Sequence, residues 1–130
     1  MSTTPATSDL TKLRDEITAA ITAAGITAVA YLPDRLNPPL ALVQPGSPYI
    51  EPSKTSRPGA VRWAIHHEVI LLVAPGDKRH QTVSLDALIE DSLGALVPFG
   101  IDQVAQPYSL QIGQNGPSYF AARIQLTTTR

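Results

Sequence analysis

The sequence VRWAIHHEVILLVA, residues 61–74, decides the fold of this chain. Its apolar residues recur with a period of two, as in a β-strand, where successive side chains point to opposite faces of a sheet. On one face only His67 interrupts the apolar residues, which are Val61, Trp63, Ile65, Val69, Leu71 and Val73. The other face starts polar and ends apolar, with Arg62, His66, Glu68, Ile70 and Leu72. The pattern predicts a strand covered throughout on one face and only over its second half on the other.

Two amphipathic helices flank this strand in the sequence. Ser8 is placed to cap a helix that begins at Asp9, and Gly25 is placed to end it. A second helix is expected over residues 78–96, followed by the stop signals Pro98 and Gly100. The first apolar stripe comprises Leu10, Leu13, Ile17, Ile21 and Ala24, and the second comprises Val83, Leu85, Leu88, Ile89, Leu93 and Leu96. Both helices are therefore expected to pack on an apolar surface.

Four further segments have strand-like patterns, namely residues 26–32, 40–44, 108–112 and 120–127. Pro38 and Pro39 predict a short antiparallel connection between the first two. Asn115 and Gly116 suit the turn of a hairpin formed by the last two, with one face exposed to water. The predicted order is α-β-β-β-α-β-β. It favours an α+β fold, with two helices on a mainly antiparallel sheet of about five strands.

The composition limits the classes of function. A chain of 130 residues fits a single domain, expected over residues 9–130, after a flexible N-terminal arm at residues 1–8. With 10 Lys and Arg against 11 Asp and Glu, no overall positive field would attract nucleic acid. The absence of Cys excludes disulfides and thiolate sites. We find neither a secretory signal nor an apolar segment near the ~20 residues of a membrane span, so the cytoplasm is the expected compartment.

A long Pro-rich loop is expected at residues 45–60. It contains two apolar residues in an otherwise polar run, Tyr49 and Ile50. Long loops inside compact domains often carry function, and Tyr is favoured at intermolecular contacts. The same two side chains would equally serve to anchor the loop to its own core. Both interpretations stay open at the level of the sequence.

Basic residues concentrate around this loop and the turn before the second helix, at Lys54, Arg57, Arg62, Lys78 and Arg79. They would add solubility, or they would complement an acidic face on a neighbouring subunit. The candidate acidic face lies on the second helix and comprises Asp86, Glu90 and Asp91. We therefore take Tyr49, Ile50, Arg57, Arg62, Asp86 and Glu90 as candidate contact residues.

The sequence offers little for catalysis or metal binding. His66 and Glu68 would share one face of the strand, and His80 would join them only if the second helix returned over that face. Asp86 and Glu90 lie one turn apart on an exposed helix face. Carboxylates in water lack the desolvation that acid–base catalysis usually requires. We find no nucleophile elbow and no phosphate-binding loop in the sequence. We therefore expect no metal, no cofactor and no enzymatic activity.

Over residues 10–126 the chain resembles the tail terminator (tail completion) proteins of long-tailed bacteriophages, particularly the small versions from phages of actinobacteria. The likeness lies in the order of elements: the helix ending at Gly25, the strand at 40–45 with its Pro-rich loop, and the strand at 61–74. Single residues that contribute are Tyr31, Pro33, Asp34, Arg35, Pro38, Pro39, Leu85, Asp86, Leu88 and Ile89.

The resemblance implies a structural subunit of the virion, assembled in the host cytoplasm and located at the head-proximal end of the tail. Such subunits form a ring, expected to be a hexamer, that caps the tail tube, stops its growth and joins the tail to the head connector. The implied partners are other copies of the chain, the tail tube protein and the connector or stopper protein. Duplex DNA would pass through the lumen without specific binding, and no membrane is involved.

Two other classes remain as alternatives. The nearer one is another head-to-tail joining protein, such as a connector stopper or a minor tail protein. The more distant one is a small-molecule-binding or enzymatic α+β domain, which would have a concave pocket with converging polar groups.

Overall fold

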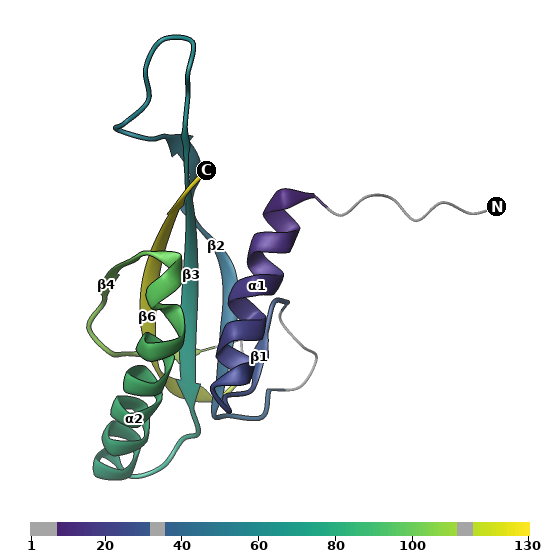
Figure 1. Ribbon diagram of the computed structural model, residues 1–130. Helices are drawn as coiled ribbons and strands as arrows, with labels where there is room; N and C mark the ends of the chain where they lie inside the picture. Colours follow the sequence, from purple (N-terminus) through teal and green to yellow (C-terminus); the bar gives the residue numbers. More distant parts are fainter. Residues whose placement is uncertain (1–7, 32–35, 112–115) are drawn as a thin grey trace, which may run out of the picture.

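A computed structural model describes residues 8–31, 36–111 and 116–130, and within these ranges it confirms the α+β fold (Figure 1). Two helices lie on one face of a six-stranded mixed sheet that is mostly antiparallel. The elements are α1 (Asp9–Ala23), β1 (Ala28–Val29), β2 (Leu40–Pro52), β3 (Trp63–Val73), α2 (Lys78–Leu96), the 3-10 turn η1 (Val97–Phe99), β4 (Ile101–Val104), β5 (Tyr108–Gln111) and β6 (Ser118–Thr129). The spatial order of strands is β1-β2-β3-β6-β4, and β5 also pairs with β6.

Both helices begin where the sequence predicts. The Ser8 hydroxyl accepts a hydrogen bond from the Thr11 backbone N–H at 3.2 Å, which caps α1. After Ala23 the chain leaves the helix at Gly25, whose φ of 87° is unfavourable for other residues. The expected arm at residues 1–8 lies outside the described residues except for Ser8, which belongs to this cap. The bounds of α2 are those predicted, and the Asp77 side chain caps it.

The central strand β3 has the two different faces that its sequence predicts. On the helix-covered face, Ile65, Val69, Leu71 and Val73 are buried in the main core together with the apolar stripes of α1 and α2. On the opposite face, Ile70 and Leu72 belong to a second, smaller apolar cluster, while His66 and Glu68 are only half-buried. Half of this outer face is therefore left without an apolar cover.

The first two strands differ from the prediction, because β1 pairs with β2 in parallel and not antiparallel. β1 is only two residues long, Ala28 and Val29. The returning chain therefore has a short distance to cover before it enters β2 in the same direction. Residues 32–35 of this connection, which contribute to the family resemblance, lie outside the described residues.

The prediction of a loop at residues 45–60 is wrong over its first half, because β2 continues to Pro52. A β-bulge makes this possible: Pro45 pairs with His67 and Ile50 with Ile65, so residues 46–49 all lie opposite His66. Prolines are tolerated at bulges and on edge strands, where no ladder hydrogen bond is lost. Only residues 53–62 remain as a loop, and this β2–β3 loop, named the finger below, projects beyond the body of the molecule (Figure 1).

The last part of the chain forms the predicted hairpin, in which β5 pairs with β6. Asn115 of the expected turn lies outside the described residues, and Gly116 lies at the edge of the described part. The sequence did not predict β4, which pairs with β6 next to β5. Three of its four residues are exposed, so it lacks the alternation that marks a half-buried strand.

Candidate functional site

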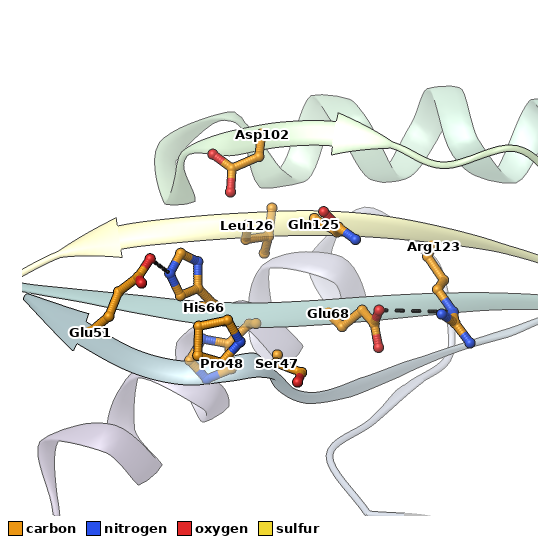
Figure 2. A pocket seen from close by; sticks show the side chains of 11 residues that line it. Ser47, Pro48, Glu51, His66, Glu68, Asp102, Arg123, Gln125 and Leu126 are labelled. Atoms are coloured by element: carbon orange, nitrogen blue, oxygen red, sulfur yellow. Dashed lines mark hydrogen bonds and ion pairs between the residues drawn. The ribbon is translucent and has the colours of Figure 1, made fainter. Parts of the chain in front are cut away.

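The outer face of the sheet, opposite the helices, is apolar at one end and polar at the other. The apolar end is the smaller cluster, formed by the buried residues Leu40, Leu42, Ile70, Leu72, Tyr119 and Ala121. At the polar end the sheet forms a hollow of about 420 Å³ between the β2 bulge and β4, which we call the trough (Figure 2). Its lining residues are Gly46, Ser47, Pro48, Glu51, His66, His67, Glu68, Asp102, Arg123, Gln125 and Leu126.

The bulge that forms one wall of the trough rests directly on β3. A Cβ atom added at Gly46 would lie 2.8 Å from the His66 Cβ and 3.1 Å from the His66 carbonyl carbon. Neither atom is the free end of a flexible side chain, so only glycine allows the two strands to approach this closely.

His66 occupies the centre of a polar chain that crosses the trough. Its Nε2 lies 2.8 Å from Glu51 Oε1, and its Nδ1 lies 2.9 Å from Thr127 Oγ1. The Thr127 hydroxyl in turn donates to the Asp102 carboxylate. The hydrogen bonds therefore connect Glu51, His66, Thr127 and Asp102 across the trough.

A second polar group lies deeper along the same face. Glu68 accepts a hydrogen bond from the Gln44 amide at 2.9 Å and lies 3.8 Å from the Arg123 guanidinium. Arg123 donates from Nε to the Tyr108 hydroxyl at 2.9 Å, and its guanidinium lies 4.7 Å from the centre of the Tyr108 ring. The hydrogen bond to Tyr108 raises the pKa of Arg123, and the charge of Glu68 raises it further. Arg123 therefore stays a fixed positive charge at one end of the trough.

The trough as a whole is acidic. It contains three carboxylates, those of Glu51, Glu68 and Asp102, and one guanidinium, that of Arg123. The carboxylates are accessible to different degrees, since the Glu51 side chain is 50% exposed and that of Glu68 is 18% exposed. A partly desolvated anionic hollow of this kind is suited to receive a positively charged group.

Among the described residues, those that line the trough do not form a metal site. His66 and Glu68 share a face, as the sequence predicts, but His80 lies beside Val73 and Gln81 at another hollow. Across the described ranges, no three His, Asp or Glu side chains gather in a way that could hold an ion. The chemistry offered by the trough is therefore hydrogen bonding and charge.

Tyr49, the first candidate contact residue, points into the body and not to the surface. Its hydroxyl accepts a hydrogen bond from Arg14 Nη2 of α1 at 3.0 Å. Its ring meets the ring of His67 edge-to-face, with centroids 5.7 Å apart. Of the two interpretations left open by the sequence, this geometry favours the one in which Tyr49 anchors its segment to its own core.

His67, which interrupts the apolar face of β3, is buried beneath Tyr49 with only 1% of its surface exposed. Neither ring nitrogen has a hydrogen-bond partner within the described part of the chain. Burial, followed by the charges of Arg14 and His66, lowers the pKa of His67 to about 4. The imidazole is therefore neutral at physiological pH and acts as a core residue.

Ile50, the second candidate, is exposed and belongs to an apolar patch at the base of the finger. The patch includes Val61 and Trp63, which the sequence placed on the buried face of the strand and which are instead 51% and 47% exposed. Trp63 is the first residue of β3 and Val61 lies in the finger, which projects beyond the body of the molecule (Figure 1). A shallow hollow of about 340 Å³ runs through the patch, lined by Asp9, Leu10, Ile50, Trp63, Ile65 and Arg130.

The four charged candidates are all exposed but belong to two separate regions. Arg57 and Arg62 lie on the finger, and Asp86 and Glu90 lie on α2. In Figure 1 the finger projects from one end of the sheet, away from α2. The structure therefore does not bring the two sets together within one chain.

The sequence missed most of the trough residues, although part of the signal was present. Arg123, Gln125 and Thr127 alternate with apolar residues along the last strand, which predicts a polar face there. That this face adjoins His66 and Glu68 depends on the register, which pairs His66 with Thr127 and Glu68 with Gln125. Glu51 was missed because the strand predicted at residues 40–44 was not expected to extend to Pro52, and Asp102 was missed because β4 was not predicted.

None of the helices in the described ranges is both long enough and apolar enough to cross a bilayer. No protein-family model matches the chain, and no curated protein matches its sequence.

Proposed function

We propose that this protein is a structural virion protein of the tail-terminator type, which forms a ring at the head-proximal end of a phage tail tube. In this role the ring stops polymerisation of the tube and joins the tail to the head connector. The proposal combines the family resemblance of the sequence with one observation of the structure. That observation is the exposed apolar patch of Ile50, Val61 and Trp63 at the base of a projecting finger.

Ile50 and Trp63 line one shallow hollow, and exposed apolar side chains that gather in this way are typical of a surface that a partner covers. Trp in particular is enriched among the residues that dominate binding energy, when neighbouring contacts exclude water from it. The patch adjoins the start of α1 through Leu10 and Asp9, so a partner seated there would contact both layers of the fold. A subunit contact at this position would use the rigid sheet and not a loose segment.

The rest of the molecule suits the proposed position in the virion. The partners would be other copies of the chain in a hexameric ring, the tail tube protein on one side and the connector or stopper protein on the other. A net charge of -1 would limit adhesion of the duplex DNA that passes through the lumen. The role requires no cofactor and no catalytic residue, since shape and surface chemistry perform it.

The test is binding to the two proposed neighbours, measured by pull-down with assembled tail tubes and, separately, with the connector protein. We expect the purified chain to bind the tube end, and we expect Trp63→Ser to reduce that binding at least ~10-fold, because a central apolar contact is lost. Val83→Ser is the matched control, since Val83 is 58% exposed on α2, far from the patch in sequence. Binding to the connector alone would identify a stopper, and binding to neither would refute the proposal.

A small-molecule-binding or enzymatic function is the second candidate, and the trough is the observation that favours it. Thr127, His66 and Glu51 form a hydroxyl–imidazole–carboxylate chain next to a hollow. However, the Thr127 hydroxyl already donates to Asp102, so His66 does not act as its base in this arrangement. Loss of a turnover activity in His66→Ala or Glu68→Gln, in a protein that stays monomeric, would support this candidate over the ring.

A further inference from the structure

The finger carries three positive charges that have no partner among the described residues of the chain. Lys54, Arg57 and Arg62 are exposed, and their side chains form no ion pair or hydrogen bond with any described residue. The segment 53–62 contains no carboxylate that could balance them. By contrast, Arg123 and Arg130 lie on the body of the molecule and do form ion pairs, with Glu68 and Glu16 respectively.

The finger is nevertheless a defined structure, because its backbone is hydrogen-bonded across its width. Ser53 N–H donates to the Arg62 carbonyl at 2.8 Å, and the Ser56 hydroxyl bridges the two sides through the Arg62 carbonyl and N–H. At the tip, Arg57 and Ala60 exchange backbone hydrogen bonds of 3.3 and 2.9 Å. Such a preformed element loses little conformational entropy on binding. The backbone positions of its three basic residues are therefore defined before binding.

The trough provides the complementary charge on the same chain. Its three carboxylates outnumber its single guanidinium, and among the described residues Asp102 forms no ion pair. It is also concave, whereas Asp86 and Glu90 lie on the convex surface of a helix. A projecting element with positive charges would bury more of its surface in the trough than on the helix.

The finger cannot easily occupy the trough of its own chain. It continues along the direction of β2 and β3, away from the sheet (Figure 1), whereas the trough opens sideways on the outer face, with the helices behind it (Figure 2). To enter it, the finger would have to fold back from the direction of β2 and β3 onto the outer face of the sheet. The two surfaces are thus complementary in charge and point in different directions.

We propose that the finger of one copy, residues 53–62, binds in the trough of the next copy, so that Lys54, Arg57 and Arg62 face Glu51, Glu68 and Asp102. The contact joins two different surfaces, and repeating it around an axis produces a closed ring when the rotation between neighbours closes. This inference deepens the proposed function and rests on its ring. It replaces the acidic face of α2, with Asp86 and Glu90, as the receptor of the basic finger.

A second copy fits these observations better than nucleic acid does. The finger alone would attract phosphate, but the three carboxylates of the trough repel it, and the chain as a whole has a net charge of -1. A self-contact uses both charged surfaces at once and leaves neither one exposed.

The test is a charge-swap series on self-association, measured by analytical ultracentrifugation at two salt concentrations. We expect Arg57→Glu and Asp102→Arg each to raise the dissociation constant between copies about 10-fold or more, because each introduces a repulsion into the contact. The double variant, Arg57→Glu with Asp102→Arg, should recover to within about 3-fold of the wild-type constant, since the two reversed charges attract again. Arg79→Glu is the matched control, an identical charge change on an exposed arginine of α2.

Circular dichroism establishes that each variant is folded, and Lys54→Glu serves as a second finger variant. If the wild type assembles but the finger and trough variants assemble equally well, the finger–trough contact is refuted while the ring stands. If Arg57→Glu is rescued by Asp86→Arg and not by Asp102→Arg, the receptor is α2 and the proposal is overturned. A wild-type chain that remains monomeric overturns both the contact and the proposed function.

Discussion

At the scale of single residues, the two adjacent histidines show how one strand gives the same side chain two different roles. His66 points to the outer face, where Glu51 and Thr127 provide hydrogen bonds. His67 points to the helix-covered face, where its buried ring contacts Tyr49 and finds no hydrogen-bond partner among the described residues. The alternation of the strand alone separates a polar histidine in the trough from an apolar one in the core.

The buried histidine predicts that the stability of the subunit falls on acidification. The pKa of His67 is about 4 in the folded chain against 6.5 for the free side chain, so between these pH values the unfolded chain binds more protons. The part of the stability that depends on a neutral His67 is therefore complete above pH 6.5 and is lost as the pH falls toward 4. At about 1.4 kcal/mol per pKa unit, the loss is roughly 3 kcal/mol.

Urea denaturation of His67→Phe at several pH values measures this effect, because phenylalanine keeps an aromatic ring but binds no proton. We expect the difference in unfolding free energy between variant and wild type to grow as the pH falls from 6.5 to 4. His80→Phe, a change at an exposed histidine, should follow the wild type. A parallel pH dependence in wild type and His67→Phe would show that His67 is not buried as described.

At the scale of elements, the β2 bulge determines most of what is distinctive in this molecule. It inserts residues 46–49 opposite His66, lets β2 continue to Pro52, and sets one wall of the trough. It also turns Tyr49 toward the core and leaves Glu51 facing His66. Gly46 permits the close approach that the bulge requires.

We expect Gly46→Ala to destabilise the subunit by about 1–3 kcal/mol, as overpacking typically does, because the new methyl group meets His66 at its Cβ and backbone. Gly76→Ala is the control, since a Cβ there meets no atom within 4 Å. Chemical denaturation of both variants gives the comparison. Equal stability of the two would mean that the bulge does not press on β3.

The elements also show which parts of this fold a sequence can reveal. The bounds of α2, the cap at Ser8 and, over residues 65–73, the two different faces of β3 follow from local patterns, and the structure confirms them; the predicted cover fails at Val61 and Trp63. The bulge, the parallel pairing of β1 and the short strand β4 depend on which segments become neighbours. Pro45 and Pro48 accordingly resembled loop residues, because nothing local shows that Pro45 would pair with His67 and that Pro48 would lie in a β-bulge.

The same distinction holds for the candidate site. Arg57 and Arg62 were identified from charge alone and do lie exposed on the finger. The trough was missed because its residues come from β2, β3, β4 and β6 and meet only through the sheet register. A shift of one residue in that register would turn Gln125 and Thr127 to the other face.

At the scale of the whole molecule, the proposed assembly would cover three surfaces that the single chain leaves exposed. The chain carries an apolar patch, an acidic trough on the outer face of the sheet, and a basic finger that projects beyond the body of the molecule (Figure 1). Small stable monomers seldom leave such surfaces exposed together. The three surfaces are consistent with a subunit that contacts a copy on each side and further proteins above or below.

The molar mass of the purified protein in solution, measured by light scattering and supported by electron micrographs, tests this central claim most directly. The account predicts a closed species of about six times the chain mass of 13.9 kDa, visible as rings, at high protein concentration or on addition of tail tubes. A mass of 13.9 kDa under all of these conditions, with no rings in the micrographs, would contradict it.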